Sequence, residues 1–214
     1  MPSTLVHVAV AGLLAAALLR SAFGPRSVVV VLAAAAIPDL DTFLGLWIVG
    51  GHRAILHTLL LPVGLGAVIA WDSRRADSWL RARWGDAGVR TAAVGVVALA
   101  VAGIGPDLFT NGVNVLYPVV DRFVELDGEA VLSSQRGFVQ TFIDLSSEEP
   151  VGGAGVGTTN TTHYETGVDP AKGADPADVD RVFPLVRSGT QALLVVTSVG
   201  VLAARFLEDR GDGT

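Results

Sequence analysis

The sequence predicts an all-α membrane protein: a polytopic membrane helical bundle of about five transmembrane helices with an acidic extracytoplasmic segment. Half of the 214 residues are hydrophobic and only 17% are charged, whereas a soluble domain of this size needs less apolar surface to fill its core. The apolar residues form long blocks, and a helix that crosses a bilayer needs ~20 such residues. Because only helices and closed barrels satisfy their own backbone in lipid, we expect the blocks to be helices.

The expected helices cover residues 5–19, 27–37 with 43–49, 55–71, 91–104 and 188–206. No basic residue precedes the first block and Arg20 follows it, which reverses the charge order of a cleaved signal peptide. We therefore expect a retained first helix. Three regions result: a four-helix membrane core over 1–118, an acidic and partly flexible extracytoplasmic segment over 119–186, and a fifth transmembrane helix with a cytoplasmic tail over 187–214.

Arginines predict how the helices are oriented, because cytoplasmic loops are enriched in basic residues. They gather in three places, at residues 20–26, 74–90 and 205–210. With these clusters in the cytoplasm, the chain crosses the cell membrane five times, with its N-terminus outside and its C-terminus inside. The outer face then receives residues 38–57 and 106–186.

Composition excludes several partners and sites. The chain has no cysteine, so neither disulfides nor a thiolate metal site are expected. Its net charge of −6 argues against a nucleic-acid partner and leaves the lipid bilayer as the expected one. Lys172 is the only lysine among fifteen basic residues, a pattern typical of halophilic archaea or of a high-GC genome. Within the acidic segment we expect a loop at 152–162 and amphipathic helices or short strands at 122–142.

Four clusters of polar residues lie near the ends of the apolar blocks. Ionisable groups are costly there, so a membrane anchor alone does not explain them. All four fall on the outer face once the arginines have set the orientation, so their coincidence is independent evidence for a shared site. Imidazole and carboxylate groups together suit Zn²⁺ or a similar divalent ion, whereas carboxylates alone would suit Mg²⁺ or Ca²⁺. The candidate metal ligands are His7, Asp39, Asp41, His52, His57 and Asp107.

Spacing limits how these residues could share an ion. Asp39 and Asp41 lie two apart and share a face only if the backbone is extended, which Pro38 favours. His52 and His57 are five apart, ~140° around a helix. Both could therefore bind one ion only if His52 lies in the turn before the helix.

Each candidate also has a simpler interpretation. His7 could be an interfacial histidine, Asp41 could cap a short helix, and Asp107 could end one. His163 lies in flexible sequence, and we expect it to be solvated. Arg53 would be free to neutralise a carboxylate or to bind an anionic substrate group.

In these motifs the sequence resembles the membrane-bound metal-dependent hydrolase family, which includes the LexA-binding, inner-membrane-associated hydrolases. That family has an early helix with a His, then P-D-x-D, then G-H-R-x-x-x-H-[ST], and a helix that ends in D-x-x-T followed by Gly and Pro. The resemblance covers residues 1–118 and, with the composition, suggests a haloarchaeal member. The matching residues are His7, Pro38-Asp39-Leu40-Asp41, Gly51-His52-Arg53, His57-Thr58, Asp107, Thr110, Gly112 and Pro118.

The resemblance implies a divalent metal, zinc, held by some of the six candidate ligands, and hydrolysis of a phosphoester by a metal-activated water. The substrate would be a lipid or lipid-linked ester at the outer membrane face. Asp107 or Asp41 would act as general base, and Arg53 would stabilise charge on the phosphate. The family usually has a His at the position of Gly103, so fewer metals, altered chemistry or an inactive relative are all open. The alternatives are an ion-binding or transport protein and a non-catalytic membrane scaffold.

Overall fold

The computed structural model describes residues 2–142, 155–175 and 177–211. A π-helical stretch, η3 (Leu99–Ile104), and two 3₁₀ turns, η1 (Arg20–Ala22) and η2 (Pro38–Leu40), accompany the α-helices. The α-helices are α1 (Thr4–Leu18), α2 (Pro25–Ala36), α3 (Asp41–Gly45), α4 (Leu60–Arg74), α5 (Trp79–Ala98), α6 (Gly105–Leu108) and α7 (Gly189–Gly211).

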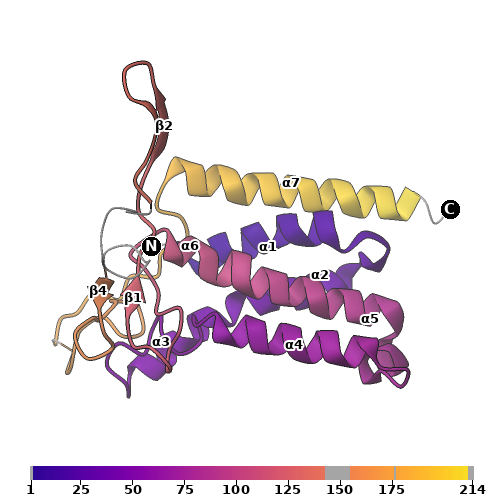
Figure 1. The fold of residues 1–214 in the computed structure, drawn as a ribbon, viewed down its shortest axis with the longest axis horizontal. Coiled ribbons are helices and arrows are strands. Elements are labelled where there is room, and N and C mark those ends of the chain that lie inside the picture. Colours follow the sequence, from indigo (N-terminus) through magenta and orange to yellow (C-terminus); the bar gives the residue numbers. More distant parts are fainter. Residues whose placement is uncertain (1, 143–154, 176, 212–214) are drawn as a thin grey trace.

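The five long helices lie side by side, so that successive connections alternate between two ends of the bundle (Figure 1). One end carries the N-terminus, α3, α6 and the strands. The other end carries the α1–α2 and α4–α5 connections and the C-terminus. α1 packs against α2 and α7, while α5 packs against α2 and α4. The arginine clusters therefore lie at one end, and the four polar clusters lie at the other.

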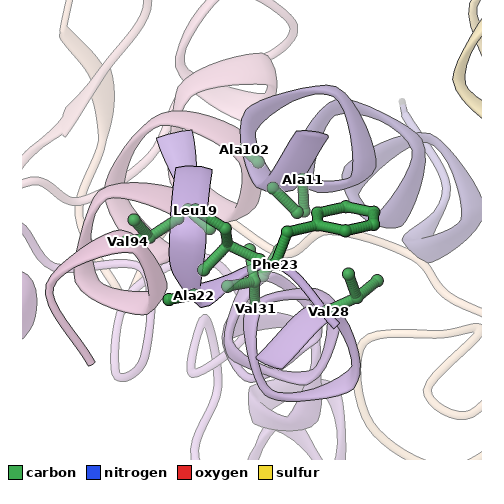
Figure 2. Packing of buried hydrophobic residues seen from close by; sticks show 11 residues of the cluster. Ala11, Leu19, Ala22, Phe23, Val28, Val31, Val94 and Ala102 are labelled. Atoms are coloured by element: carbon green, nitrogen blue, oxygen red, sulfur yellow. The ribbon is translucent and has the colours of Figure 1, made fainter. Parts of the chain in front are cut away.

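Small side chains let the helices approach closely. Ala11 and Ala98 are fully buried in the main apolar cluster, and Figure 2 shows the ring of Phe23 beside Ala11. A Cβ on Gly12 would lie only 2.5 Å from the Oγ of Ser198, so α7 approaches α1 closely at this glycine. Close approach through small residues is a general mode of helix association in lipid.

Two helical segments are long and apolar enough to cross a membrane, Trp79–Leu108 and Gly189–Asp209. A third results if α2 and Pro38–Gly45, which are bent by 47°, form one span. The expected five spans are therefore not supported in the part of the chain that the structure describes. α1 and α4 have 15 residues each and rise ~22 Å, less than the ~30 Å of a bilayer's hydrocarbon core.

Two helices begin at different places from those expected. α4 begins at Leu60 rather than at residue 55, because the residues before it form turns that hold His52 and His57 at the end of the bundle. α5 begins at Trp79 rather than at residue 91, and it consists of two helical stretches that meet at a kink at Gly85, where φ is 66° and ψ is −169°. Its start is capped by the Oγ of Ser78, which accepts a hydrogen bond from the N–H of Arg81, and such a cap stabilises a helix even in polar sequence.

Short strands correct the all-α expectation, since the fold is mainly but not entirely helical. β1 (Phe123–Val124) pairs antiparallel with β4 (Gly155–Gly157), and β2 (Ala130–Ser133) pairs antiparallel with β3 (Gly137–Gln140). Alternation alone allows either helices or strands at residues 122–142. Gly137, with a φ of +68°, permits the tight turn that closes the β2–β3 hairpin.

Candidate metal centre

The candidate ligands meet at the end of the bundle that carries the N-terminus. His7 lies near the start of α1, Asp39 in η2, Asp41 at the start of α3, His57 before α4, and Asp107 in α6. The side chain of Asp39 is 22% exposed, whereas the other four are almost inaccessible. The chain therefore places ionisable groups from separate segments in one buried cluster, in which Asp39 is the only partly exposed member of these five.

Four of these side chains point at one another. The Nε2 of His7 lies 3.4 Å from Oδ2 of Asp107 and 3.8 Å from Oδ1 of Asp39. The Nε2 of His57 lies 3.0 Å from the same Asp107 oxygen and 3.9 Å from the same Asp39 oxygen. Two imidazole nitrogens and two carboxylate oxygens are thus grouped together.

These nitrogen–oxygen separations are compatible with a divalent ion, and ligand atoms of His7, Asp39 and Asp107 all lie within 4.8 Å of one another. With bonds of ~2.1 Å to nitrogen and oxygen, neighbouring ligands of a tetrahedral zinc site lie ~3.4 Å apart. The four separations range from 3.0 to 3.9 Å and bracket that value. The Nε2 of His7 is also buried and makes no well-aligned hydrogen bond to a described residue, although Oδ2 of Asp107 lies 3.4 Å away. A buried polar atom of this kind requires an explanation, and metal ligation supplies one.

The backbone of η3 fixes the ring of His7. Its Nδ1 lies 2.7 Å from the carbonyl oxygen of Ala102, so Nδ1 carries the proton and Nε2 presents its lone pair to the cluster. In an α-helix the Ala102 carbonyl would accept a hydrogen bond from residue 106, but Pro106 has no N–H. The carbonyl is therefore available to orient a candidate ligand, in keeping with the frequent occurrence of π-helical segments at functional sites.

Asp41 binds the ring of His57 through Nδ1, the nitrogen that does not face Asp107. Its Oδ2 accepts a hydrogen bond from Nδ1 of His57 at 2.9 Å, and its Oδ1 accepts one from Nδ1 of His52 at 2.7 Å. Both are ordinary hydrogen-bond lengths, and a carboxylate behind a ligating histidine is a common arrangement in metal sites. The expectation that Asp39 and Asp41 share a face of extended backbone is wrong, because η2 is a 3₁₀ turn.

His57 is strongly affected by its neighbours. Burial by itself lowers the pKa of the imidazole, but the carboxylates of Asp41 and Asp107 outweigh it and raise the pKa to about 9. In the metal-free protein the ring is therefore protonated at neutral pH. A divalent ion would replace the proton on Nε2, so its binding would release a proton.

Arg53 makes contacts different from those of a substrate-binding cation. Its side chain is fully buried, and its Nη1 donates to the carbonyl oxygens of Thr110 and Gly112. Its Nη2 donates to Oδ1 of Asp107 at 2.5 Å. The ring of Tyr164 lies 4.8 Å from its Cζ, a favourable cation–π contact. These contacts place Arg53 to hold Asp107 in position.

Two further residues, Thr4 and Tyr164, contact the candidate ligands or Arg53. Thr4 donates from Oγ1 to Oδ2 of Asp39 at 2.5 Å. Its position three residues before His7 places both on one side of α1, so a helical projection could have found it. Tyr164 lies in the acidic segment outside any motif, and no sequence signal indicates its contact with Arg53.

His52 lines a cavity next to the cluster. The cavity has a volume of about 680 Å³ and also reaches Asp39 and Thr42. His52 is 5% exposed, and its Nε2 has no partner among the residues described. His163, expected to be solvated, is instead largely buried, with Nδ1 3.8 Å from Oδ2 of Asp169.

Gly103 allows close packing behind the cluster. A Cβ at this position would lie 2.7 Å from the carbonyl oxygen of Ala35 and 3.0 Å from Cγ of Pro38. The missing side chain lets η3 pack directly against the end of α2 and the start of η2. A histidine here would therefore clash with backbone before it could add a ligand.

Comparison with known proteins assigns the chain to a family. The sequence model of the YdjM inner membrane proteins matches residues 1–158, which is more than half of the chain and includes all six candidate ligands. The chain belongs to the YdjM inner membrane protein family. Membership agrees with the long apolar helices, and this YdjM-family protein is a membrane protein. No curated protein and no solved structure matches it.

Proposed function

We propose that this YdjM-family protein is a membrane-embedded, metal-dependent hydrolase that acts on a phosphoester. His7, His57, Asp39 and Asp107 would hold a divalent ion, and two imidazoles with two carboxylates favour zinc over magnesium or calcium. The observation that carries the proposal is the convergence of these four side chains from four elements. The buried His7 Nε2, which makes no well-aligned hydrogen bond to a described residue, supports it.

A catalytic zinc ion keeps one position for water beside three protein ligands, so a water would have to take the place of one of these four side chains for the ion to activate it and act as a Lewis acid. The surrounding side chains set the geometry, since Asp41 holds His57 and Arg53 holds Asp107. Asp39 is the partly exposed carboxylate and lines the cavity, so it is within reach of a solvent molecule there. Asp107 and Asp41, which the sequence suggested as general bases, are buried and hydrogen-bonded within the protein, so we assign that role to neither of them.

The distribution of charge supports a centre on the outer membrane face. The arginine-bearing connections lie at the opposite end of the bundle, which would face the cytoplasm. In this orientation the N-terminus is outside and the C-terminus is cytoplasmic, and Figure 1 shows the two termini at opposite ends. A reporter cleaved or labelled only from one side of the membrane, fused to either terminus, tests this orientation.

Metal analysis of the purified protein is the first test of the centre. The wild-type chain should hold stoichiometric zinc, whereas His57→Gln and Asp107→Ala should hold little, since each removes a ligand. His163→Gln is the matched control because it removes an imidazole outside the centre. Wild-type protein without stoichiometric metal, or His57→Gln protein with as much metal as wild type, would contradict the site.

Hydrolysis is tested with chromogenic phosphomonoesters and phosphodiesters. Turnover should be lost on chelation and restored by zinc. Asp39→Asn replaces a charged metal ligand with a neutral amide of the same shape, so zinc content and turnover should both fall. Zinc-loaded wild-type protein that hydrolyses neither ester would refute the enzymatic assignment and leave a metal-binding scaffold.

A further inference from the structure

The cavity beside the centre contains more than the residues that hydrolysis requires. Its volume of about 680 Å³ lies in the range of pockets that bind small molecules. At one end it is lined by Asp39 and by His52, whose Nε2 is buried without a partner in the described parts of the chain. This end offers polar groups next to the candidate metal ligands.

Another wall of the cavity is apolar and comes from the chain just before α7. Val182, Phe183 and Leu185 line it, and all three are more than half exposed. The chain then enters α7, which contains a segment able to cross a membrane. The wall therefore lies near the bilayer surface, and an apolar chain could pass from lipid into the cavity with little exposure to water.

Arg187 adds a positive charge between this wall and α7. It is the only arginine or lysine among the described residues that line the cavity. Its backbone N–H donates to Gln191, but within the described ranges its guanidinium has no hydrogen bond or ion pair. An arginine at the end of a membrane helix could be an interfacial anchor alone. Because it lines a cavity that also reaches Asp39, its guanidinium could in addition bind an anionic group of a ligand there.

We propose that the cavity binds an anionic amphiphile, a phosphoester whose phosphate is recognised by Arg187 and the metal centre and whose apolar chain lies along Val182, Phe183 and Leu185. Hydrolysis of the bound ester rests on the proposed function, to which this inference adds the class of substrate. The exposed carboxylates of Glu165 and Asp180 also line the cavity. Their charges oppose the binding of an anion, so the attraction must come from Arg187 and the metal centre.

Binding to the zinc-loaded, full-length protein in nanodiscs tests the inference directly. Calorimetric titration compares dihexanoyl phosphatidate with inorganic phosphate, which share the phosphate but not the apolar chain. Phosphatidate should bind at least tenfold more tightly, because its chains are removed from water. Arg187→Gln should weaken phosphatidate binding by about tenfold or more, as expected for loss of a charge-assisted hydrogen bond. Leu185→Ser should reduce the preference for phosphatidate over phosphate.

Two matched controls lie in the exposed β2–β3 hairpin, outside the cavity. Arg136→Gln removes an exposed guanidinium, and Leu132→Ser removes a leucine that is 85% exposed. Both should bind phosphatidate as wild type does. Should Arg187→Gln fail to fold, Arg187→Lys replaces it. Lysine keeps the charge but loses the bidentate geometry. The Arg187→Lys protein should therefore bind phosphatidate specifically, but more weakly than wild type.

The outcomes separate the inference from the proposed function. Equal binding of phosphatidate and inorganic phosphate, or equal affinities of the Arg187 and Arg136 variants, overturns the amphiphile site even if soluble esters are hydrolysed. Tight binding of phosphatidate that depends on Arg187 supports the site. If that binding occurs while no ester is hydrolysed, the site stands and the proposed function fails.

Discussion

Replacing Gly103 with alanine tests whether close packing behind the centre is what positions Asp39. The new Cβ would lie 2.7 Å from the carbonyl oxygen of Ala35, whereas ordinary contacts begin at 3.4 Å. η3 and the end of α2 must therefore separate by ~0.7 Å, and overpacking of this kind costs ~1–3 kcal/mol. Since the oxygen belongs to the backbone, no side-chain rotation can relieve the contact.

The same displacement should weaken the centre. The Cβ would also lie 3.0 Å from Cγ of Pro38, and Asp39 is the next residue. A shift of several tenths of an ångström exceeds the ~0.2 Å tolerance of metal–ligand distances. We expect zinc affinity to fall by ~10–100-fold, the scale observed when groups that support metal ligands are changed. Gly103→His should likewise lower the affinity rather than raise it.

Gly95→Ala is the matched control on the same run of helix. Its Cβ would lie 3.7 Å from the Cβ of Ala34, an ordinary contact, and alanine is favoured over glycine in a helix interior by up to ~1 kcal/mol. The two substitutions should therefore shift stability in opposite directions. Thermal unfolding in detergent and a zinc competition titration measure both effects. Gly103→Ala protein that unfolds no earlier than wild type and binds zinc equally well would refute the packing argument.

Proton competition at His57 predicts opposite pH dependences for two forms of the protein. Because the pKa of His57 is raised from 6.5 to about 9, its protonation stabilises the metal-free fold fully below pH 6.5, and this stability is lost as the pH rises through 9. Zinc affinity should rise over the same pH range, because fewer protons compete for the ring. Melting curves of the metal-free protein and zinc titrations measure the two trends, and trends in the same direction would contradict this prediction. Asp41→Asn should lower zinc affinity ~10–100-fold without abolishing binding, as a chelator competition shows, and unchanged affinity would exclude a supporting role. Ser78→Ala should lower stability by ~1 kcal/mol through loss of the helix cap while zinc content stays the same, and a shared loss of metal would contradict a purely local effect.

The end of the bundle at which the polar residues meet could be predicted from sequence. Alternating connections between helices put residues 38–57 and 106–118 at one end whenever residues 20–26 and 74–90 lie at the other, and this does not require every helix to be long enough for a full span. The number of membrane spans could not be predicted in the same way, because it depends on the length of each helix. Apolar composition does not reveal that Pro38 bends the second block, or that α4 begins only at Leu60.

The division of roles within the cluster could not be predicted. Asp39 and Asp41 have the same chemistry and are two residues apart, so only the observed 3₁₀ turn of η2 shows which faces His7 and which lies behind His57. The role of Arg53 could not be predicted either, since its burial depends on carbonyl groups more than fifty residues away in the sequence. Contacts of this kind depend on the packing of distant segments, which a single sequence does not display.

The metal centre and the apolar wall of the cavity are encoded in different stretches of the chain. All six candidate ligands lie within residues 1–158, which match the YdjM family, whereas Val182, Phe183, Leu185 and Arg187 come after the match ends. Substitutions in the segment before α7 could therefore alter the wall of the cavity without changing any candidate ligand. In evolutionary terms, the cavity wall and the cluster of His and Asp side chains can diverge independently.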